Sequence, residues 1–356
     1  MKRLLKLLGG LLGAVVLAVL GLFAYLALSA VWPAHPVGVQ QVLAADPGHP
    51  PIGVTIYYPT TEAPGLHWLG MSFAYFAPNA AITDGRHPLV VISHGTAGGP
   101  MSHLDTALAL AEAGYVVAAP LHNGDNFQDT SKVGTSEWFI DRSRQIARVN
   151  DFLLDQWKDR DRLDPKRLGI FGFSAGGTTA LIAVGGTPDF GLVEPLCKSH
   201  PEFVCQLQKP GVPMRVPAAT EWTHDARISA AVVVAPGYGF TFEPDGLSAV
   251  RARVQLWEGS LDASLPLATN AGAVRRLLPQ PPEFHLVDNA DHFSFLMPCG
   301  AAGLLLPKML CADPDGFDRT AFHAQFNAAV VAFFNESLRE PAGEQNVSGS
   351  DEPPAH

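Results

Sequence analysis

The chain has 356 residues, 47% of them hydrophobic, with a formal net charge of −10 and an isoelectric point near 5.7. This much apolar sequence can bury a large core, which excludes a disordered or fibrous protein. The acidic balance argues against nucleic acid as a partner, because phosphate binding needs concentrated Lys and Arg, and no basic cluster follows the first residues. A small-molecule or lipid-like substrate suits the charge better.

Residues 1–36 are predicted to form a signal-anchor segment. Three basic residues among the first six precede an uncharged run from Leu7 to Val31. A helix rising about 1.5 Å per residue over this run would cross a hydrocarbon core of about 30 Å. The run is longer than the apolar core of a typical cleaved signal, which favours an uncleaved anchor, although Ala27 and Ser29 leave cleavage and secretion as the alternative. The positive-inside rule then places the rest of the chain on the exported side, the periplasmic or extracytoplasmic face of the cytoplasmic membrane in a bacterium.

Apolar strands and amphipathic helices alternate through a predicted catalytic domain at residues 37–335. After a connector rich in Pro and Gly, strands are predicted in chain order at 51–59, 87–95, 114–120, 167–174, 227–236, 253–259 and 283–292, with helices at 136–157 and 175–184. This alternation predicts an α/β fold with a mostly parallel sheet and helices on both faces. A Pro-rich stretch at 187–223 is predicted as an insertion, and the polar residues 336–356 as a disordered tail.

A candidate nucleophile lies between a predicted strand and a predicted helix. The stretch Gly172-Phe173-Ser174-Ala175-Gly176 has the G-x-S-x-G pattern of a nucleophile elbow, in which a strained strand-to-helix turn exposes the serine hydroxyl. A tight glycine turn is the simpler interpretation of the pattern alone. The strand before Ser174 and the helix after it favour the elbow.

A serine hydroxyl needs a base to take its proton, and α/β-hydrolases supply the acid and then the histidine from later strands. Asp262 follows the strand at 253–259, and His292 follows the next one. Glu258 lies closer to the strand end, but the turn after it gives Asp262 the reach. Asp288 is the weaker alternative for the acid.

Two backbone N–H groups are predicted to bind the oxyanion formed when Ser174 attacks a carbonyl. One belongs to Ala175, at the start of the helix, and the other to Thr96, in the loop after the strand at 87–95. His94 lies in the same loop and is interpreted as a residue that orders it, because it precedes the serine on another strand.

Four cysteines form two sequence-local pairs, Cys197 with Cys205 and Cys299 with Cys311. Three connectivities are possible. In an oxidising compartment the local pairs are the economical choice, each closing a short loop. A zinc site is the alternative, but the spacing does not resemble a zinc finger or ribbon.

Four aromatic residues near the expected site are candidates for the wall of an apolar pocket: Trp138, Tyr238, Phe240 and Phe293. Ordinary core packing explains each of them equally well.

Four motifs together, "PLVVISHGTAGG", "RLGIFGFSAGG", "LWEGSLDASLP" and "NADHFSF", resemble the predicted dienelactone hydrolase group of the α/β-hydrolase superfamily, with similarity to bacterial relatives of platelet-activating-factor acetylhydrolase. The resemblance covers roughly residues 52–335 and implies an esterase-like serine hydrolase without metal or organic cofactor. The chain departs from the group in its anchor, in a serine where true dienelactone hydrolase has cysteine, and in lacking the acetylhydrolase acid one strand earlier, where it reads "APGYGF".

The sequence therefore predicts an exported, membrane-tethered hydrolase of carboxylic esters that acts through Ser174, His292 and Asp262 and an acyl-enzyme intermediate. An amidase or peptidase with the same triad is one alternative. A catalytically silent hydrolase-fold module that binds or assembles at the envelope is the other. The oligomeric state leaves no recognisable mark in the sequence.

Overall fold

The computed structural model describes residues 2–28, 30–70, 72–217, 220–300, 303 and 306–339. The strands are β1 (Val37–Ala44), β2 (Ile52–Pro59), β3 (Gly65–Leu69), β4 (Ser72–Pro78), β5 (His87–Ser93), β6 (Val116–Leu121), β7 (Leu163–Phe173), β8 (Ile228–Val234), β9 (Arg253–Gly259) and β10 (Glu283–Val287). The helices are α1 (Lys2–Leu28), α2 (Leu104–Glu112), α3 (Trp138–Asp155), α4 (Ala175–Ala183), α5 (Val193–Ser199), α6 (Phe203–Gln206), α7 (Ala271–Leu277), α8 (Lys308–Cys311) and α9 (Arg319–Ser337), with 3-10 turns η1 (Arg160–Arg162), η2 (Phe190–Leu192), η3 (Gly239–Phe242) and η4 (His292–Phe295).

The ten strands form one mixed sheet in the order β10-β9-β8-β7-β5-β6-β2-β1-β4-β3. The six strands from β10 to β6 are parallel, and β2 runs antiparallel to both β6 and β1. The parallel strands are apolar along most of their length because helices cover both of their faces. The predicted α/β-hydrolase architecture, a mostly parallel sheet between helices, is confirmed.

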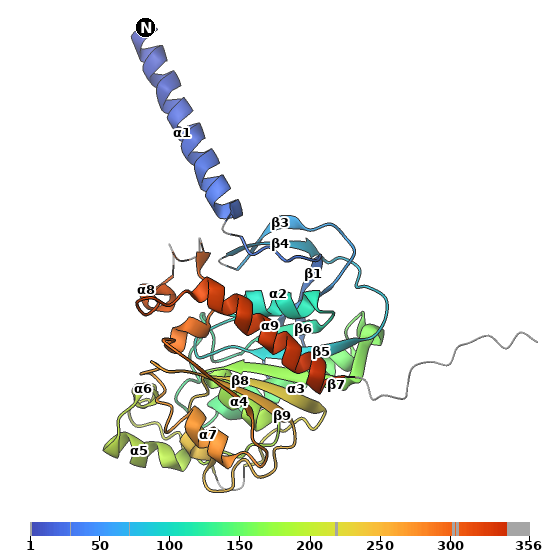
Figure 1. Cartoon of the computed structure of the whole chain (residues 1–356), viewed down its shortest axis with the longest axis vertical. Helices are drawn as coiled ribbons and strands as arrows, with labels where there is room; N and C mark the ends of the chain where they lie inside the picture. Colours follow the sequence, from blue (N-terminus) through green and yellow to red (C-terminus); the bar gives the residue numbers. More distant parts are fainter. Residues whose placement is uncertain are drawn as a thin grey trace, which may run out of the picture.

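Two layers of helices enclose the sheet (Figure 1). One hydrophobic core joins buried residues of α2 and α9 to one face of the strands, and a second core joins α3, α4 and α7 to the other face. The parallel strands therefore have their carboxyl ends at a common edge, between the two layers of helices. Loops that leave this edge can bring distant side chains together.

The sequence analysis expected only a connector between the anchor and the strand at 51–59. The structure has a further strand there, β1. This strand pairs with β2 along its whole length, from Val37 opposite Pro59 to Ala44 opposite Ile52. The strand was not predicted because Pro and Gly residues lie on either side of it, and because its stability comes from pairing with β2 and not from local sequence. The hairpin of β3 and β4 was also not predicted.

The N-terminal helix α1 stands away from the rest of the molecule (Figure 1). Its stretch from Leu8 to Tyr25 is long and apolar enough to cross a membrane, and none of it is buried against the protein. By length and composition it fits either a membrane anchor or a signal sequence.

The predicted insertion lies between α4 and β8 and contains η2, α5 and α6. Both predicted cysteine pairs lie at bonding distance: Cys197 and Cys205 in the insertion, and Cys299 and Cys311 after η4, have S–S distances of 1.96 Å. Helix α9 continues to Ser337, so the first residues of the predicted tail are helical. Residues 340–356 of that tail lie outside the described part of the chain.

Candidate active site

Ser174 occupies a strained turn between β7 and α4. Its backbone angles are φ 56° and ψ −120°, a conformation that a residue with a Cβ rarely adopts. A Cβ at Gly172 would strike the carbonyl of Gly176, and a Cβ at Gly176 would strike the carbonyl of Ser93, so only glycine allows this close approach. The turn leaves the Ser174 side chain partly exposed at the carboxyl edge of the sheet, which is the geometry of a nucleophile elbow.

His292 links Ser174 to Asp262. Its Nδ1 lies 2.7 Å from Asp262 Oδ2, and its Nε2 lies 3.0 Å from Ser174 Oγ. Because an ionised carboxylate can only accept, Nδ1 is the donor, and Nε2 is left to accept the serine proton. Both the Asp262 and the His292 side chains are almost fully buried. The residues predicted from three separate strand ends therefore form one hydrogen-bonded chain.

The neighbouring carboxylates have other partners. Asp291 accepts hydrogen bonds from the backbone N–H and the hydroxyl of Ser294, which caps η4 and holds the turn that carries His292. Asp288 is exposed and accepts a long hydrogen bond, 3.4 Å, from Ser260 Oγ. It lies on the same loop as His292 but forms no hydrogen bond or ion pair with the imidazole.

Glu258 is a second carboxyl group beside Asp262. It is fully buried, and its Oε1 accepts a hydrogen bond from the Gly259 N–H at 3.0 Å, while Oε2 has no hydrogen-bond partner among the described residues. Burial and the nearby charge of Asp262 raise the pKa of Glu258 to about 9. At neutral pH this side chain is therefore a neutral acid beside Asp262.

The loop after β5 holds the second predicted oxyanion donor. In the described part of the chain, neither the Thr96 N–H nor the Ala175 N–H has a hydrogen-bond acceptor. The next residue, Ala97, has a left-handed φ of 54°, which bends the loop at this point. A Cβ added at Gly95 would lie 3.0 Å from the Phe173 ring and 3.3 Å from the Ser174 Cβ, closer than such atoms usually approach. The loop therefore passes close to the elbow, and glycine leaves the room for it.

A buried ion pair under this loop was not predicted from the sequence. Asp125 Oδ1 accepts from the Ala97 N–H at 2.7 Å, and Asp125 Oδ2 accepts from Arg142 Nη1 at 2.5 Å and from Trp138 Nε1 at 2.6 Å. Both charged side chains are about 1% exposed. The hydrogen bond from the Ala97 N–H to Asp125 holds the bend of the loop, and Arg142 holds Asp125 in place. Losing either charged partner would leave the other charge buried without compensation.

Arg142 also connects the loop to the elbow helix. Its Nη2 donates to the His94 carbonyl and to Ser93 Oγ, and its Nε donates to Thr179 Oγ1 at 2.9 Å on α4. His94 orders the same loop, as expected, because its Nδ1 lies 2.7 Å from the Gly95 carbonyl oxygen. Burial, reinforced by the charge of Arg142, lowers the pKa of His94 to about 4, so this imidazole is neutral at pH 7.

The aromatic residues predicted for a pocket differ in exposure. Trp138 and Tyr238 are each 1% exposed and pack in an aromatic cluster with Phe139 and Phe190, which favours the packing interpretation. Phe240 is 9% exposed at the edge of this cluster. Phe293 is partly exposed, and its ring centroid lies 5.3 Å from that of His292. Of the four, Phe293 is thus placed directly against the Ser–His–Asp chain.

The insertion lies beside the loop that carries Asp262. Glu202 accepts hydrogen bonds from Thr269 Oγ1 at 2.6 Å and from Asn270 Nδ2 at 3.1 Å. The Tyr238 hydroxyl also donates to the carbonyl of Val204, at 3.4 Å. The insertion and the disulfide inside it are therefore attached to the segment that follows Asp262.

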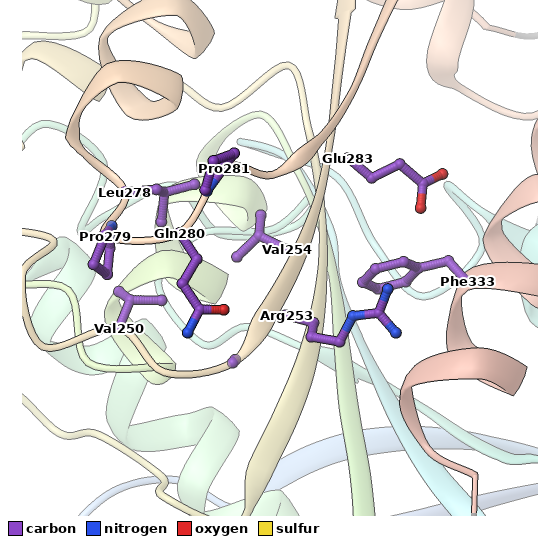
Figure 2. A pocket seen from close by; sticks show the side chains of 10 residues that line it. Val250, Arg253, Val254, Leu278, Pro279, Gln280, Pro281, Glu283 and Phe333 are labelled. Carbon is purple, nitrogen blue, oxygen red and sulfur yellow. The ribbon is translucent and has the colours of Figure 1, made fainter.

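A cavity of about 90 Å³ lies elsewhere, between the start of β9, the loop before β10 and Phe333 of α9 (Figure 2). Arg253, at the amino end of β9, packs over the Phe333 ring at 5.8 Å. Ser174 follows the carboxyl end of a parallel strand, so this cavity is at the opposite edge of the sheet. Within the described ranges, no group of three or more His, Cys, Asp or Glu side chains is arranged to hold a metal ion.

The sheet order, the elbow and the side chains at the carboxyl edge define an α/β-hydrolase fold. Residues 74–194 match the model of the dienelactone hydrolase family. No protein of curated function matches the sequence.

Several solved structures share the fold. A ferulic acid esterase from Streptomyces cinnamoneus superimposes with a TM-score of 0.62 at 19% identity, over 90% of this chain and 97% of its own. A dienelactone hydrolase from Anabaena variabilis has a TM-score of 0.50 at 16% identity, over 86% of this chain and 100% of its own. A puromycin-hydrolyzing peptidase from Mycobacterium tuberculosis has a TM-score of 0.53 at 16% identity, over 86% of this chain and 40% of its own.

Proposed function

We propose that this protein hydrolyses carboxylic esters through a Ser174-His292-Asp262 triad. The observation that carries the proposal is the continuous hydrogen-bonded chain from Asp262 Oδ2 through His292 to Ser174 Oγ, on a serine held at φ 56°. The match to the dienelactone hydrolase family and the fold shared with a ferulic acid esterase support an ester as the substrate.

In the proposed reaction, Ser174 Oγ attacks the ester carbonyl carbon while His292 Nε2 takes its proton. The oxyanion that forms is bound by the N–H groups of Thr96 and Ala175. His292 then gives its proton to the leaving alcohol, and an acyl group remains on Ser174. Water, deprotonated by His292, releases the acid and restores the serine. Asp262 keeps the imidazole in the required tautomer and stabilises its charged form throughout.

We further propose that α1 anchors the protein in the membrane, with residues 37–335 as the catalytic domain on the exported side. The unburied apolar helix supports an anchor, and the two disulfides support an oxidising compartment. The basic residues Lys2, Arg3 and Lys6 keep the N-terminus on the cytoplasmic side by the positive-inside rule, which puts the catalytic domain on the other side.

The test uses the full-length protein in detergent. A fluorophosphonate probe should label the wild type and should not label Ser174→Ala, because only an activated serine reacts with it. Rates on matched p-nitrophenyl esters and p-nitroanilides of the same acyl group then separate an esterase from an amidase. Absence of labelling would support a catalytically silent module, and a faster rate on the anilide would replace the esterase proposal with an amidase.

A further inference from the structure

Two uncharged segments of the chain meet at the exit of α1. Residues 7–45 contain no Asp, Glu, Lys or Arg, and neither do residues 63–83, which include the hairpin of β3 and β4. The backbone joins them: the Val31 N–H donates to the Phe73 carbonyl at 3.1 Å, and the Tyr75 N–H donates to the Val31 carbonyl at 3.0 Å. The hairpin is therefore attached three residues beyond the end of α1, beside which it lies in Figure 1.

Aromatic side chains gather where the two segments meet. The rings of Trp32 and Tyr75 stack with centroids 3.9 Å apart, and Trp68 packs edge-on against Phe73 at 4.8 Å. Trp32 is 68% exposed and Trp68 is 56% exposed. Two carboxylates bonded to these parts of the chain accept backbone hydrogen bonds: Glu62 from the Ala81 N–H at 2.7 Å and Glu112 from the His35 N–H at 2.8 Å.

Strand β3 is the last strand of the sheet. Soluble proteins usually protect such an edge with charged side chains, prolines or a covering element, because an open apolar edge pairs with other chains. The β3 sequence, Gly-Leu-His-Trp-Leu, has none of the charged side chains that give this protection. An uncharged edge that bears an exposed Trp instead fits the headgroup region of a bilayer, where Trp and Tyr rings have an apolar and a polar side to satisfy.

We propose that the hairpin of β3 and β4 lies on the lipid bilayer and seats the catalytic domain on the membrane surface. The inference rests on the proposed anchor, which brings the hairpin to the bilayer through Val31. Trp32, Trp68 and Tyr75 form the contact surface, and the lipid headgroup and upper acyl region is its partner. The domain then sits in one orientation on the membrane and does not swing freely on a flexible tether.

The experiment measures tryptophan fluorescence of the full-length protein in nanodiscs that hold one copy each, made with ordinary phosphatidylcholine or with phosphatidylcholine brominated at acyl carbons 6 and 7. We expect brominated lipid to quench the emission of Trp32 and Trp68. Trp68→Phe should reduce the quenched emission by roughly half, because one of two interfacial rings is lost. Trp222→Phe is the matched control: Trp222 is a partly exposed Trp in the insertion, packed near Phe190, and its loss should leave the quenched emission unchanged.

The Trp68→Phe variant should still show quenching of Trp32, which tests whether the anchor is inserted. The quenched emission that is lost on replacing Trp68 then reports on the hairpin alone. An unchanged rate on a soluble ester shows that the variant is folded. If Trp68 is quenched by aqueous acrylamide and not by brominated lipid, the hairpin faces solvent and the proposal is overturned. If its emission responds to neither quencher in single-copy nanodiscs, the ring is covered by the protein itself, which also overturns it.

Discussion

His292 and Asp262 are thirty residues apart in the chain and joined by a 2.7 Å hydrogen bond between Nδ1 and Oδ2. They come from the loops after two neighbouring parallel strands, β9 and β10. Because both strands end at the same edge, the loop after each strand needs only a short path to bring its side chain to the other. Asp288, much closer to His292 in sequence, points to Ser260 instead.

This contact predicts how the two candidate acids rank. Asp262→Asn keeps the size of the side chain but favours the wrong imidazole tautomer, so we expect kcat for ester hydrolysis to fall by at least about 10²-fold. Asp288→Asn should change kcat by less than about threefold, because it touches no reacting group. Circular dichroism checks that both variants are folded. The reverse ranking would show that the acid is assigned incorrectly.

The ion pair of Asp125 and Arg142 predicts that its loss lowers kcat more than it raises KM. Asp125→Asn removes the charge that holds Arg142 and loosens the bend at Ala97, so we expect kcat to fall about 10- to 10²-fold with a smaller change in KM. Trp138→Phe removes one donor to Asp125 and should give a weaker fall in kcat with the fold intact.

Asp189→Asn is the control for this variant, because Asp189 is an exposed loop carboxylate that also accepts a backbone N–H, from Gly191 at 2.7 Å. Its rate should equal that of the wild type. If Asp125→Asn, once shown to be folded, hydrolyses esters as fast as Asp189→Asn, the pair does not position the oxyanion loop.

Glu258 predicts a dependence of stability on pH. Its pKa is about 9 in the folded protein, raised by burial and by Asp262, whereas in the unfolded chain a glutamate loses its proton near pH 4.3. Folding therefore takes up a proton between these two values, and the free energy of unfolding falls as pH rises through this window, with a slope of up to about 1.4 kcal/mol per pH unit from this group.

Glu258→Gln removes this penalty and keeps the size of the side chain. We expect its thermal midpoint to exceed that of the wild type by more at pH 8 than at pH 5, as measured by differential scanning calorimetry. An equal difference at both pH values would mean that Glu258 is already ionised in the folded protein.

The disulfide of Cys197 and Cys205 predicts a local contribution to stability. Replacing both residues by Ser should lower the free energy of unfolding by about 2–4 kcal/mol, because the short loop gains freedom in the unfolded chain. Denaturant unfolding measures the change, and the same replacement at Cys299 and Cys311 gives the comparison. Peptide mapping without reductant should find both local pairs, and four free thiols would contradict the pairing.

The sequence by itself determined the elements that depend on local pattern. The G-x-S-x-G stretch between a buried strand and a helix predicted the turn at Ser174, because only glycine fits the close backbone approaches on either side of it. Chain order and strand ends predicted Asp262 and His292, since parallel strands bring their carboxyl ends to one edge. Cysteine spacing predicted both local pairs, because short loops close most readily.

The tertiary structure alone decided the features that depend on distant partners. Strand β1 and the hairpin of β3 and β4 exist because of pairing across the sheet, which their Pro- and Gly-rich surroundings do not indicate. Asp125 and Arg142 were not singled out in the sequence, and Glu258 was weighed there only as an acid closer to the strand end than Asp262, because a charged residue carries no local sign that it will be buried. The role of Asp125 and Arg142 depends on the counter-charge and the hydrogen bonds that the fold places around them, because a charge can be buried only where such partners meet it.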